Sequence, residues 1–371
     1  MNAPPTFAPF IDKLVDWRDF EHFVRDLYAS DPEVRVEHNV TEVGRSGARR
    51  QIDVKITQGE GKGAQATTLV ECKRWKEKVS RDRVDVLFAS IDDLEASKGV
   101  LFTTKGYEAG AEAYAKSKDI ELFIVRDMTD REWGLPGRAV WLYLHLYAAR
   151  IENLQPDAEL MAVVPNPPKT LGLNLKIGPG SDRDPVHILQ AAGTGAKGPS
   201  LLTLLYEARD RILRGLAGQI RLLDDGGEVS RAFRVPVEID LTDYPFREIP
   251  NVFGFLRLGR LRFELLAVVG QSRLDFDRGK GLDLALAVEN YVTREHDRVI
   301  RRGEATDLEV VEVAEREEGA EGEALENGTV FQVFTEPWVD VGALGANPKA
   351  LDAVRFAASD LVPPQNPDMP L

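Results

Sequence analysis

Cysteine is almost absent from this sequence of 371 residues, which contains a single one, Cys72. One thiol cannot form an internal disulfide and cannot build a zinc site from several cysteines, so neither cross-link stabilises the chain. A protein without disulfides suits a reducing compartment, and we expect a cytoplasmic location.

Long apolar runs are also missing. No stretch approaches the roughly 18 consecutive apolar residues of a membrane-spanning helix. Residues 1–17 lack the basic flank and apolar core of a signal peptide. The sequence therefore predicts no membrane partner, while its 43% hydrophobic content is ample for a core and its length favours two domains.

Positive charge is in short supply, since 47 Lys and Arg face 61 Asp and Glu and leave a net charge of −14. This balance argues against a nucleic-acid partner. Residues 73–83 are an exception, with six basic and two acidic side chains. Such a strip can bind phosphate because screening limits distant charges to about 8–10 Å, although a short basic strip is more often just a solvated face. Its basic residues are Lys73, Arg74, Lys76, Lys78, Arg81 and Arg83.

Hydrophobic periodicity in the first 130 residues predicts an α/β fold with a central mixed sheet flanked by helices. Phe20, Phe23, Val24 and Leu27 recur at helical spacing, and Pro32 follows as a stop. The final two strands are joined by a helix and should lie parallel. The predicted elements are a helix (17–29), three strands (34–43, 51–57, 67–75), a helix (81–96), a strand (98–104), a helix (107–118) and a strand (120–125).

The rest of the chain reads differently and predicts an α+β, strand-rich domain. Residues 138–154 fit a strand or a helix, and the proline-rich run 163–170 suits a linker. The acidic stretch 303–328 is expected to be a solvated loop. The predicted division is therefore 1–130, a connecting segment 131–170, and a domain 171–371. Strand-like runs lie at 171–177, 229–241, 260–269 and 329–334, and helix-like runs at 200–218 and 284–300.

Three charged residues are predicted to meet on the strands at 51–57 and 67–75. Alternate residues of a strand point the same way, so Glu71 and Lys73 share a face while Cys72 points to the other. Asp53 on the neighbouring strand can lie opposite them, with its neighbours Ile52 and Val54 facing the core. Two carboxylates and one ammonium group should therefore converge.

A divalent cation would relieve the repulsion between these carboxylates. Mg²⁺ is commonly held by one or two carboxylates and several waters, and Mn²⁺ is expected to substitute for it. Asp53 and Glu71 would supply two oxygens, and the backbone carbonyl of Cys72 a third. A water held there would become more acidic, and Lys73 could orient it or stabilise charge on a phosphate. A simple surface salt bridge between Glu71 and Lys73 is the competing interpretation.

These residues resemble the PD-(D/E)xK restriction endonuclease-like fold and, more narrowly, the Mrr-like restriction endonuclease domain. The resemblance covers roughly residues 15–126, and the order and spacing of its short motifs agree throughout. The matching segments are Phe20–Glu21, GARRQIDV (47–54), VECKRW (70–75), KGVLFTTKG (98–106) and GAEAYA (110–115).

The resemblance implies Mg²⁺-dependent hydrolysis of phosphodiester bonds, with Asp53, Glu71 and Lys73 as the signature residues. It also implies that Glu21 holds a water or a second metal ion, and that Gln51 lies near the site. Taken alone, Glu21 is more simply explained as a charge on a helix surface. One departure is that many Mrr-like domains carry Gln where this chain has Glu71, although the wider superfamily uses Glu.

Other segments offer weaker candidates. The glycine-rich loop before the second strand contains three arginines. They either contact phosphate or are simply solvated. The turn after the strand at 98–104 could hold a phosphate or cap the next helix. GEGKGA (59–64) lacks the ending of a phosphate-binding loop, and the five histidines show no metal-ligand spacing. The residues concerned in DNA binding are Arg45, Arg49, Arg50, Arg74, Lys76, Thr104 and Lys105.

The sequence thus predicts a DNA endonuclease of the restriction or anti-phage defence class, acting as a homo-oligomer because two strands need two active sites. The C-terminal domain would serve target recognition, regulation through a partner protein, or oligomerisation. Two alternatives stay open: a module that binds nucleic acid without cutting it, and a nuclease of DNA repair or junction resolution.

Overall fold

The chain folds into two compact units, each built from segments that are far apart in the sequence. The N-terminal unit comprises Pro4–Val140 and Phe276–Asn327, and the C-terminal unit comprises Trp141–Asp275 and Gly328–Leu371. The predicted boundaries at 130 and 170 do not coincide with these units. The computed structural model describes residues 4–29, 31, 33–59, 65–169, 171–172, 174–183, 187–223, 227–303, 308–312, 326–337, 339 and 347–364.

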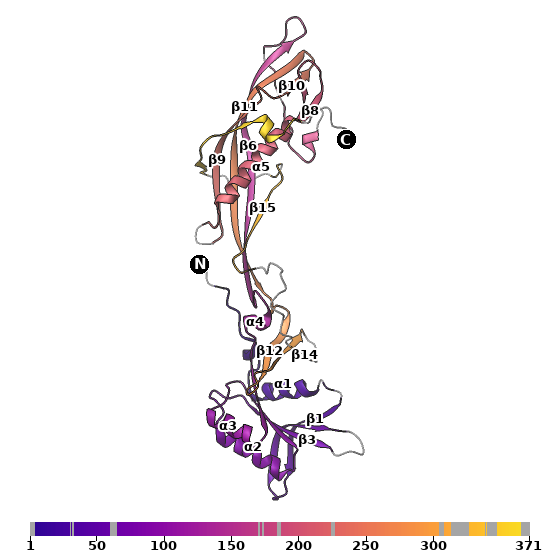
Figure 1. The fold of residues 1–371 in the computed structure, drawn as a ribbon, viewed down its shortest axis with the longest axis vertical. Coiled ribbons are helices and arrows are strands. Elements are labelled where there is room, and N and C mark those ends of the chain that lie inside the picture. Colours follow the sequence, from indigo (N-terminus) through magenta and orange to yellow (C-terminus); the bar gives the residue numbers. More distant parts are fainter. Residues whose placement is uncertain are drawn as a thin grey trace. The chain divides into compact units, whose positions relative to one another are not determined.

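The N-terminal unit is a mixed sheet with helices on both faces, which confirms the predicted fold class (Figure 1). The predicted order of helix, three-strand meander, helix, strand, helix and strand is confirmed as well. Its elements are η1 (Phe10–Lys13), α1 (Trp17–Ala29), β1 (Val34–Val43), β2 (Arg49–Gln58), β3 (Ala66–Lys73), α2 (Arg81–Asp93), β4 (Lys98–Thr103), α3 (Ala109–Ser117), β5 (Ile120–Asp127), α4 (Asp130–Trp133), β12 (Leu282–Asn290), β13 (His296–Arg302) and β14 (Glu309–Glu312).

Alternation along the strands divides the interior of this unit into two cores. Val70 and Cys72 of β3 pack with Phe20 and Val24 of α1. Leu69, on the opposite face of the same strand, packs with residues of α2 and α3. The sheet order in the described residues is β1-β2-β3-β4-β5-β12-β13-β14, with β3, β4 and β5 parallel, as predicted for β4 and β5, and the other neighbours antiparallel.

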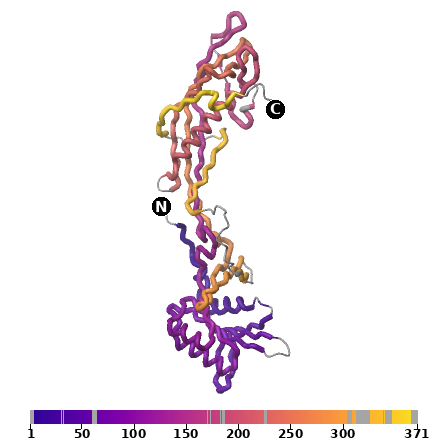
Figure 2. The backbone as a smooth tube through the Cα atoms, in the orientation of Figure 1, coloured from indigo at the N-terminus to yellow at the C-terminus, as the bar shows by residue number. Residues whose placement is uncertain are grey.

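The predicted helix at 284–300 is wrong, because this segment forms β12 and β13. Leu284 to Val288 are all between 0% and 5% exposed, since β12 lies inside the sheet between β5 and β13. A strand covered on both faces has a continuous apolar run, which mimics one face of a buried helix. Figure 2 shows this orange segment alongside the violet N-terminal strands.

The C-terminal unit is a sheet with α5 packed on it, which confirms the strand-rich α+β prediction (Figure 1). The ambiguous segment 138–154 is part of a 24-residue strand, β6. Its elements are β6 (Ala139–Ala162), η2 (Ser181–Arg183), β7 (Ile188–Ala191), β8 (Lys197–Ser200), α5 (Leu201–Gln219), β9 (Val229–Asp240), β10 (Phe246–Asn251), β11 (Gly254–Asp277), β15 (Val330–Phe334), β16 (Lys349–Ala350), β17 (Val354–Ala357) and α6 (Ala358–Leu361).

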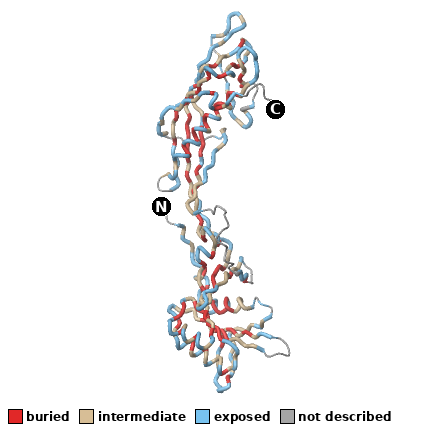
Figure 3. Tube along the Cα trace, in the orientation of Figure 1, coloured by how far each residue is buried: buried red, intermediate tan, exposed pale blue. Residues whose placement is uncertain are grey.

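Helix α5 begins at a cap that its sequence explains. The Ser200 hydroxyl accepts the backbone N–H of Leu202 at 3.1 Å, and buried leucines such as Leu205 and Leu213 face the sheet. Buried positions run along the strands of both units (Figure 3). The described part of 171–177 forms no strand, contrary to the prediction, and Pro32, Thr170 and most of 303–328 lie outside the described residues. Among the described helices, none is long and apolar enough to cross a membrane.

Replacing Leu286 by alanine should destabilise the N-terminal unit, because this fully buried side chain of β12 belongs to the core beneath α1. The expected loss is about 2–5 kcal/mol of unfolding free energy. Hydrogen exchange of the β4 and β5 amides would measure it. Val292→Ala, at an exposed position after β12, is the control and should cost less than about 0.5 kcal/mol. Equal effects of the two substitutions would show that residues 1–130 do not need β12.

Candidate active site

Asp53 stands where two strands of the sheet part. The pairing of β2 with β3 ends at Val54 and Val70, one residue short of Asp53. Beyond this point the backbone N–H of Cys72 donates to a side chain and not to a backbone carbonyl, because Asp53 Oδ2 accepts it at 2.8 Å. This bond fixes the carboxylate against the end of β3.

A local irregularity in β1 lies opposite Asp53. The ladder between β1 and β2 pairs His38 with Val54 and Val40 with Ile52, but skips the position between them. Asn39 occupies that position with a φ of 54°, which asparagine tolerates better than most residues. Ile52 then packs in the core beneath α2 and α3, whereas Val54 packs in the core beneath α1. Asp53 therefore lies between two cores. The sequence had predicted that both of its neighbours face the same core.

The structure brings the three predicted residues together. Lys73 Nζ forms an ion pair with Glu71 Oε1 and lies 3.9 Å from Asp53 Oδ2. The side chains are only 13% exposed for Asp53, 23% for Glu71 and 18% for Lys73. One ammonium group is thus shared between two carboxylates that have little access to water, so this is more than the surface salt bridge that the sequence left open.

Glu21 of α1 is a third carboxylate at this place. It is 6% exposed, so the alternative of a solvated helix charge is wrong. Its Oε2 lies 3.1 Å from Nε2 of His38 in β1. Burial, followed by the negative charges of Asp53 and Glu71, raises the pKa of Glu21 to about 7.

Burial and like charge also affect β3 itself. Burial, followed by the charge of Asp53, raises the pKa of Glu71, although Lys73 opposes this. Burial raises the pKa of the Cys72 thiol well above its usual range, so this thiol is a core side chain and not a nucleophile. Burial is thus the main cause of the raised pKa values of Glu21 and Glu71, and the neighbouring carboxylates add to it.

The donor set fits a hard divalent cation. Among the described residues no group of three or more His, Cys, Asp or Glu is arranged to hold a metal. Mg²⁺ needs less, because one or two carboxylates suffice when water supplies the other ligands. Asp53 and Glu71 are the predicted oxygen donors, and three carboxylates beside one ammonium group would favour a cation there. The carbonyl of Cys72 stays a predicted third ligand.

The predicted phosphate-binding loop is held by acidic residues of the same unit. Arg45 pairs with Asp92 at 3.1 Å, and Arg50 Nε donates to Asp93 Oδ2 at 2.9 Å. The backbone N–H and hydroxyl of Ser46 also donate to Asp93, and these bonds lower the pKa of Asp93 to about 2. Arg45 and Arg50 thus have a structural role whether or not they contact DNA.

Gln51 and Arg49 lie on the same strand as Asp53 and are both exposed. The side-chain amide of Gln51 donates to Asn39 Oδ1 at 2.9 Å, so it supports the irregular position of β1. In the described part of the chain it forms no hydrogen bond to Asp53, Glu71 or Lys73. Its catalytic role and the DNA contact of Arg49 stay predictions.

The strip after β3 carries aromatic as well as basic side chains. The indole of Trp75 lies 5.9 Å from Lys73 Nζ and 4.9 Å from the Arg83 guanidinium, close enough for cation–π attraction. Lys76 is exposed and Arg74 is partly exposed. These cations follow directly from the strand that carries Glu71 and Lys73, so they lie at the same end of the sheet.

The turn after β4 lies at that end too, because Lys73 and Thr103 are partners in the parallel ladder. Thr104 and Lys105 follow, and Lys105 is exposed. Their alternative role as a helix cap is wrong, since α3 has Glu108 at its N-cap. Of the loop 59–64, all but Gly59 lies outside the described residues.

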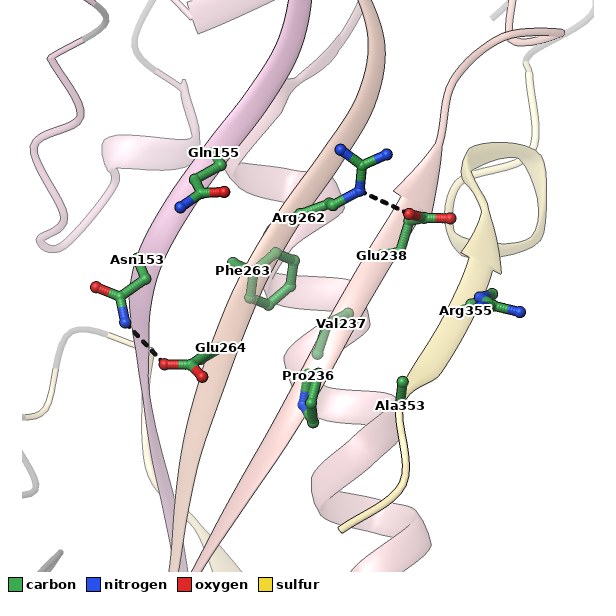
Figure 4. Close-up of a pocket in the computed structure, with 10 residues that line it drawn as sticks. All are labelled: Asn153, Gln155, Pro236, Val237, Glu238, Arg262, Phe263, Glu264, Ala353 and Arg355. Atoms are coloured by element: carbon green, nitrogen blue, oxygen red, sulfur yellow. Dashed lines mark hydrogen bonds and ion pairs between the residues drawn. The ribbon is translucent and has the colours of Figure 1, made fainter. Parts of the chain in front are cut away.

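The C-terminal unit has a separate shallow pocket of about 430 Å³ on its sheet (Figure 4). Its lining has two acidic and two basic side chains, of which Arg262 donates to Glu238 at 2.8 Å, and the neutral Asn153 donates to Glu264 at 2.7 Å. This pairing leaves the pocket without a concentration of one charge, unlike the site around Asp53.

Comparisons with known proteins agree with the motif order. Residues 12–130 match the model of the Mrr catalytic-domain family, described as restriction endonuclease. A crystal structure of a protein of unknown function, AF1548, is similar at 21% identity and a TM-score of 0.25, over 29% of this chain and 57% of that one. Comparison with curated proteins gives no match.

Glu21→Gln should make the metal-free protein more stable relative to the unmodified chain as pH rises. The pKa of Glu21 is raised to about 7, so its contribution to stability is full below about 4.5 and is lost as pH rises through about 7. The side-chain amide introduced by Glu21→Gln does not ionise, so the variant does not lose stability in this way. Thermal unfolding at pH 5 and pH 8 with a chelator would show it.

The control is Glu33→Gln, at an exposed position before β1 where water already solvates the charge. It should give the same difference from the unmodified chain at both pH values. A pH-independent effect of Glu21→Gln would contradict the electrostatic crowding described above.

Proposed function

We propose that this protein, whose residues 12–130 are a restriction endonuclease domain of the Mrr type, cuts DNA as a divalent-metal-dependent endonuclease. The observation that supports this most is the shared ammonium group. Lys73 lies between Asp53 and Glu71 at the end of β3, where loops and not helices continue the chain. Nuclease chemistry needs a cation site and a separate positive group beside one phosphate, and these residues supply both.

Asp53 and Glu71 would hold the ion, Mg²⁺ or Mn²⁺ in its place. When bound, such an ion lowers the pKa of water and neutralises charge on the phosphate. Lys73 stabilises the negative charge that builds up on a non-bridging phosphate oxygen as water attacks phosphorus and the P–O bond to the leaving oxygen breaks. Glu21, the third carboxylate beside Asp53 and Glu71, takes the proton from the attacking water.

The DNA backbone would run along the same end of the sheet. Arg74 and Lys76 continue from β3, and Thr104 and Lys105 continue from β4. Phosphate contacts of this kind give affinity without reading sequence, and they weaken as salt rises. Arg49 could extend the surface from β2. Target recognition, regulation by a partner protein or oligomerisation would then belong to the C-terminal unit.

We further propose a role in restriction or anti-phage defence in the cytoplasm, with two copies acting on the two strands of a duplex. Cleavage assays on linear, branched, methylated and unmethylated DNA would separate this role from repair or junction resolution. Preference for branched DNA irrespective of methylation would contradict the defence assignment.

Lys73→Ala should lower the cleavage rate of plasmid DNA with Mg²⁺ by at least about 100-fold, because a preorganised positive group is lost from the transition state. DNA binding should change little. The matched control is Lys98→Ala, a lysine of the neighbouring strand that pairs with Glu121 at the surface. Cleavage by Lys73→Ala at the rate of the control would overturn the assignment. An unmodified protein that binds DNA but cuts it with neither Mg²⁺ nor Mn²⁺ would support the non-cleaving module.

A further inference from the structure

A histidine that belongs to no sequence motif lies against the candidate site. His38 is in β1, directly before the irregular residue Asn39 and opposite Val54 in the ladder. Its side chain is 22% exposed, and its Nε2 lies 3.1 Å from Glu21 Oε2, while Glu21 is 8% exposed at the side chain. A helix and an edge strand therefore meet through one side-chain hydrogen bond beside Asp53.

The surroundings of Glu21 explain why this bond matters. The groups that act on it are Asp53 from β2, Glu71 and Lys73 from β3, Arg18 from its own helix, and His38 from β1. Among the described residues, His38 Nε2 is the hydrogen-bond partner of the Glu21 side chain, and it lies at Oε2. The structure gives no protein hydrogen bond to the second oxygen, Oε1, from the described residues.

His38 is suited to donate this bond as a neutral ring. Burial, followed by the positive charge of Arg25, lowers the pKa of His38. A neutral imidazole carries a proton on one nitrogen, and a carboxylate at 3.1 Å from Nε2 selects the form that is protonated there. The bond then favours the ionised form of Glu21 without adding a net charge to the site.

We propose that His38 is a positioning residue for the hydrolysis: it fixes one oxygen of Glu21 and so keeps the other oxygen in place to accept the proton of the attacking water. This inference rests on the proposed nuclease function. It assigns a role to a side chain outside the motifs that carry the resemblance. The effect of His38 must therefore pass through Glu21 and not through DNA binding or folding.

The matched variants follow from this geometry. His38→Leu removes the donor but keeps an apolar body, whereas His38→Gln can return an N–H group near the former Nε2. His22 is the control, because its exposed ring lies 4.8 Å from that of His38 and has no hydrogen bond to Glu21. His22→Leu should leave the cleavage rate unchanged.

The pH profile of cleavage separates positioning from a structural role. Loss of the bond should move the acid limb of kcat in His38→Leu to higher pH by about one unit, because the ionised form of Glu21 loses its donor. At the pH where half of Glu21 is ionised in the unmodified protein, that shift lowers kcat about fivefold, and two pH units higher it has hardly any effect. KM for DNA should stay constant, and His38→Gln should restore most of the shift. An equal loss at every pH, or no loss, would overturn the proposal.

A second measurement needs no cleavage. The carboxyl carbon of Glu21, followed by NMR in the metal-free protein, should titrate at higher pH in His38→Leu than in the unmodified chain, with His38→Gln between them. Should His38→Leu fail to fold, the titration of His38 in Glu21→Gln replaces it and should shift to lower pH, because a carboxylate partner is gone. Unchanged titrations would overturn the proposal. A protein that cuts no DNA but shows these shifts would contradict the nuclease function alone.

Discussion

The charge balance around Lys73 is the constraint on which the rest of this site depends. Asp53, Glu71 and Glu21 lie where water has little access, and one ammonium group pairs with the first two and acts electrostatically on the third. Burial disfavours the charged forms of Glu21 and Glu71, and the negative charge of Asp53 adds to this effect, so the pKa values of both carboxyl groups are raised. An arrangement of this kind is maintained against its own electrostatic cost, which is typical of functional sites and rare in parts of a fold that serve stability alone.

The fold supplies the rigidity that this cost requires. The end of β3 is fixed by the N–H of Cys72 on Asp53 and by the parallel ladder to β4. The sheet continues past β5 into β12, whose residues Leu284 to Val288 are buried on both faces. A segment some 150 residues later in the chain therefore completes the core beneath the site. The fold of residues 1–130 therefore depends on a segment from the later part of the sequence.

The sequence patterns correctly predicted those elements that depend on residue periodicity within a single segment. The amphipathic helix at Trp17–Ala29 and the alternation of Glu71 and Lys73 on β3 follow from periodicity, and both are found. The run 284–300 was assigned to a helix because burial on both faces comes from tertiary neighbours. The contact between His38 and Glu21 was not predicted for the same reason. It joins a helix to a strand, and residue spacing within either element does not show how the two pack together. Asn39 has a left-handed backbone conformation that interrupts the pairing of β1 with β2 beside Asp53. Its residue type alone could have indicated this conformation from the sequence.

The most direct measurement of the central claim is a crystal structure grown with Mn²⁺ and recorded at a wavelength that reveals its anomalous scattering. The account predicts a peak at about 2.0–2.3 Å from carboxylate oxygens of both Asp53 and Glu71, the range for hard cations with oxygen ligands. It also predicts that the ion pair between Lys73 and Glu71 breaks when the bound ion neutralises the Glu71 carboxylate. Mn²⁺ bound elsewhere in protein that cleaves DNA, with the ion pair of Lys73 and Glu71 intact, would contradict the account.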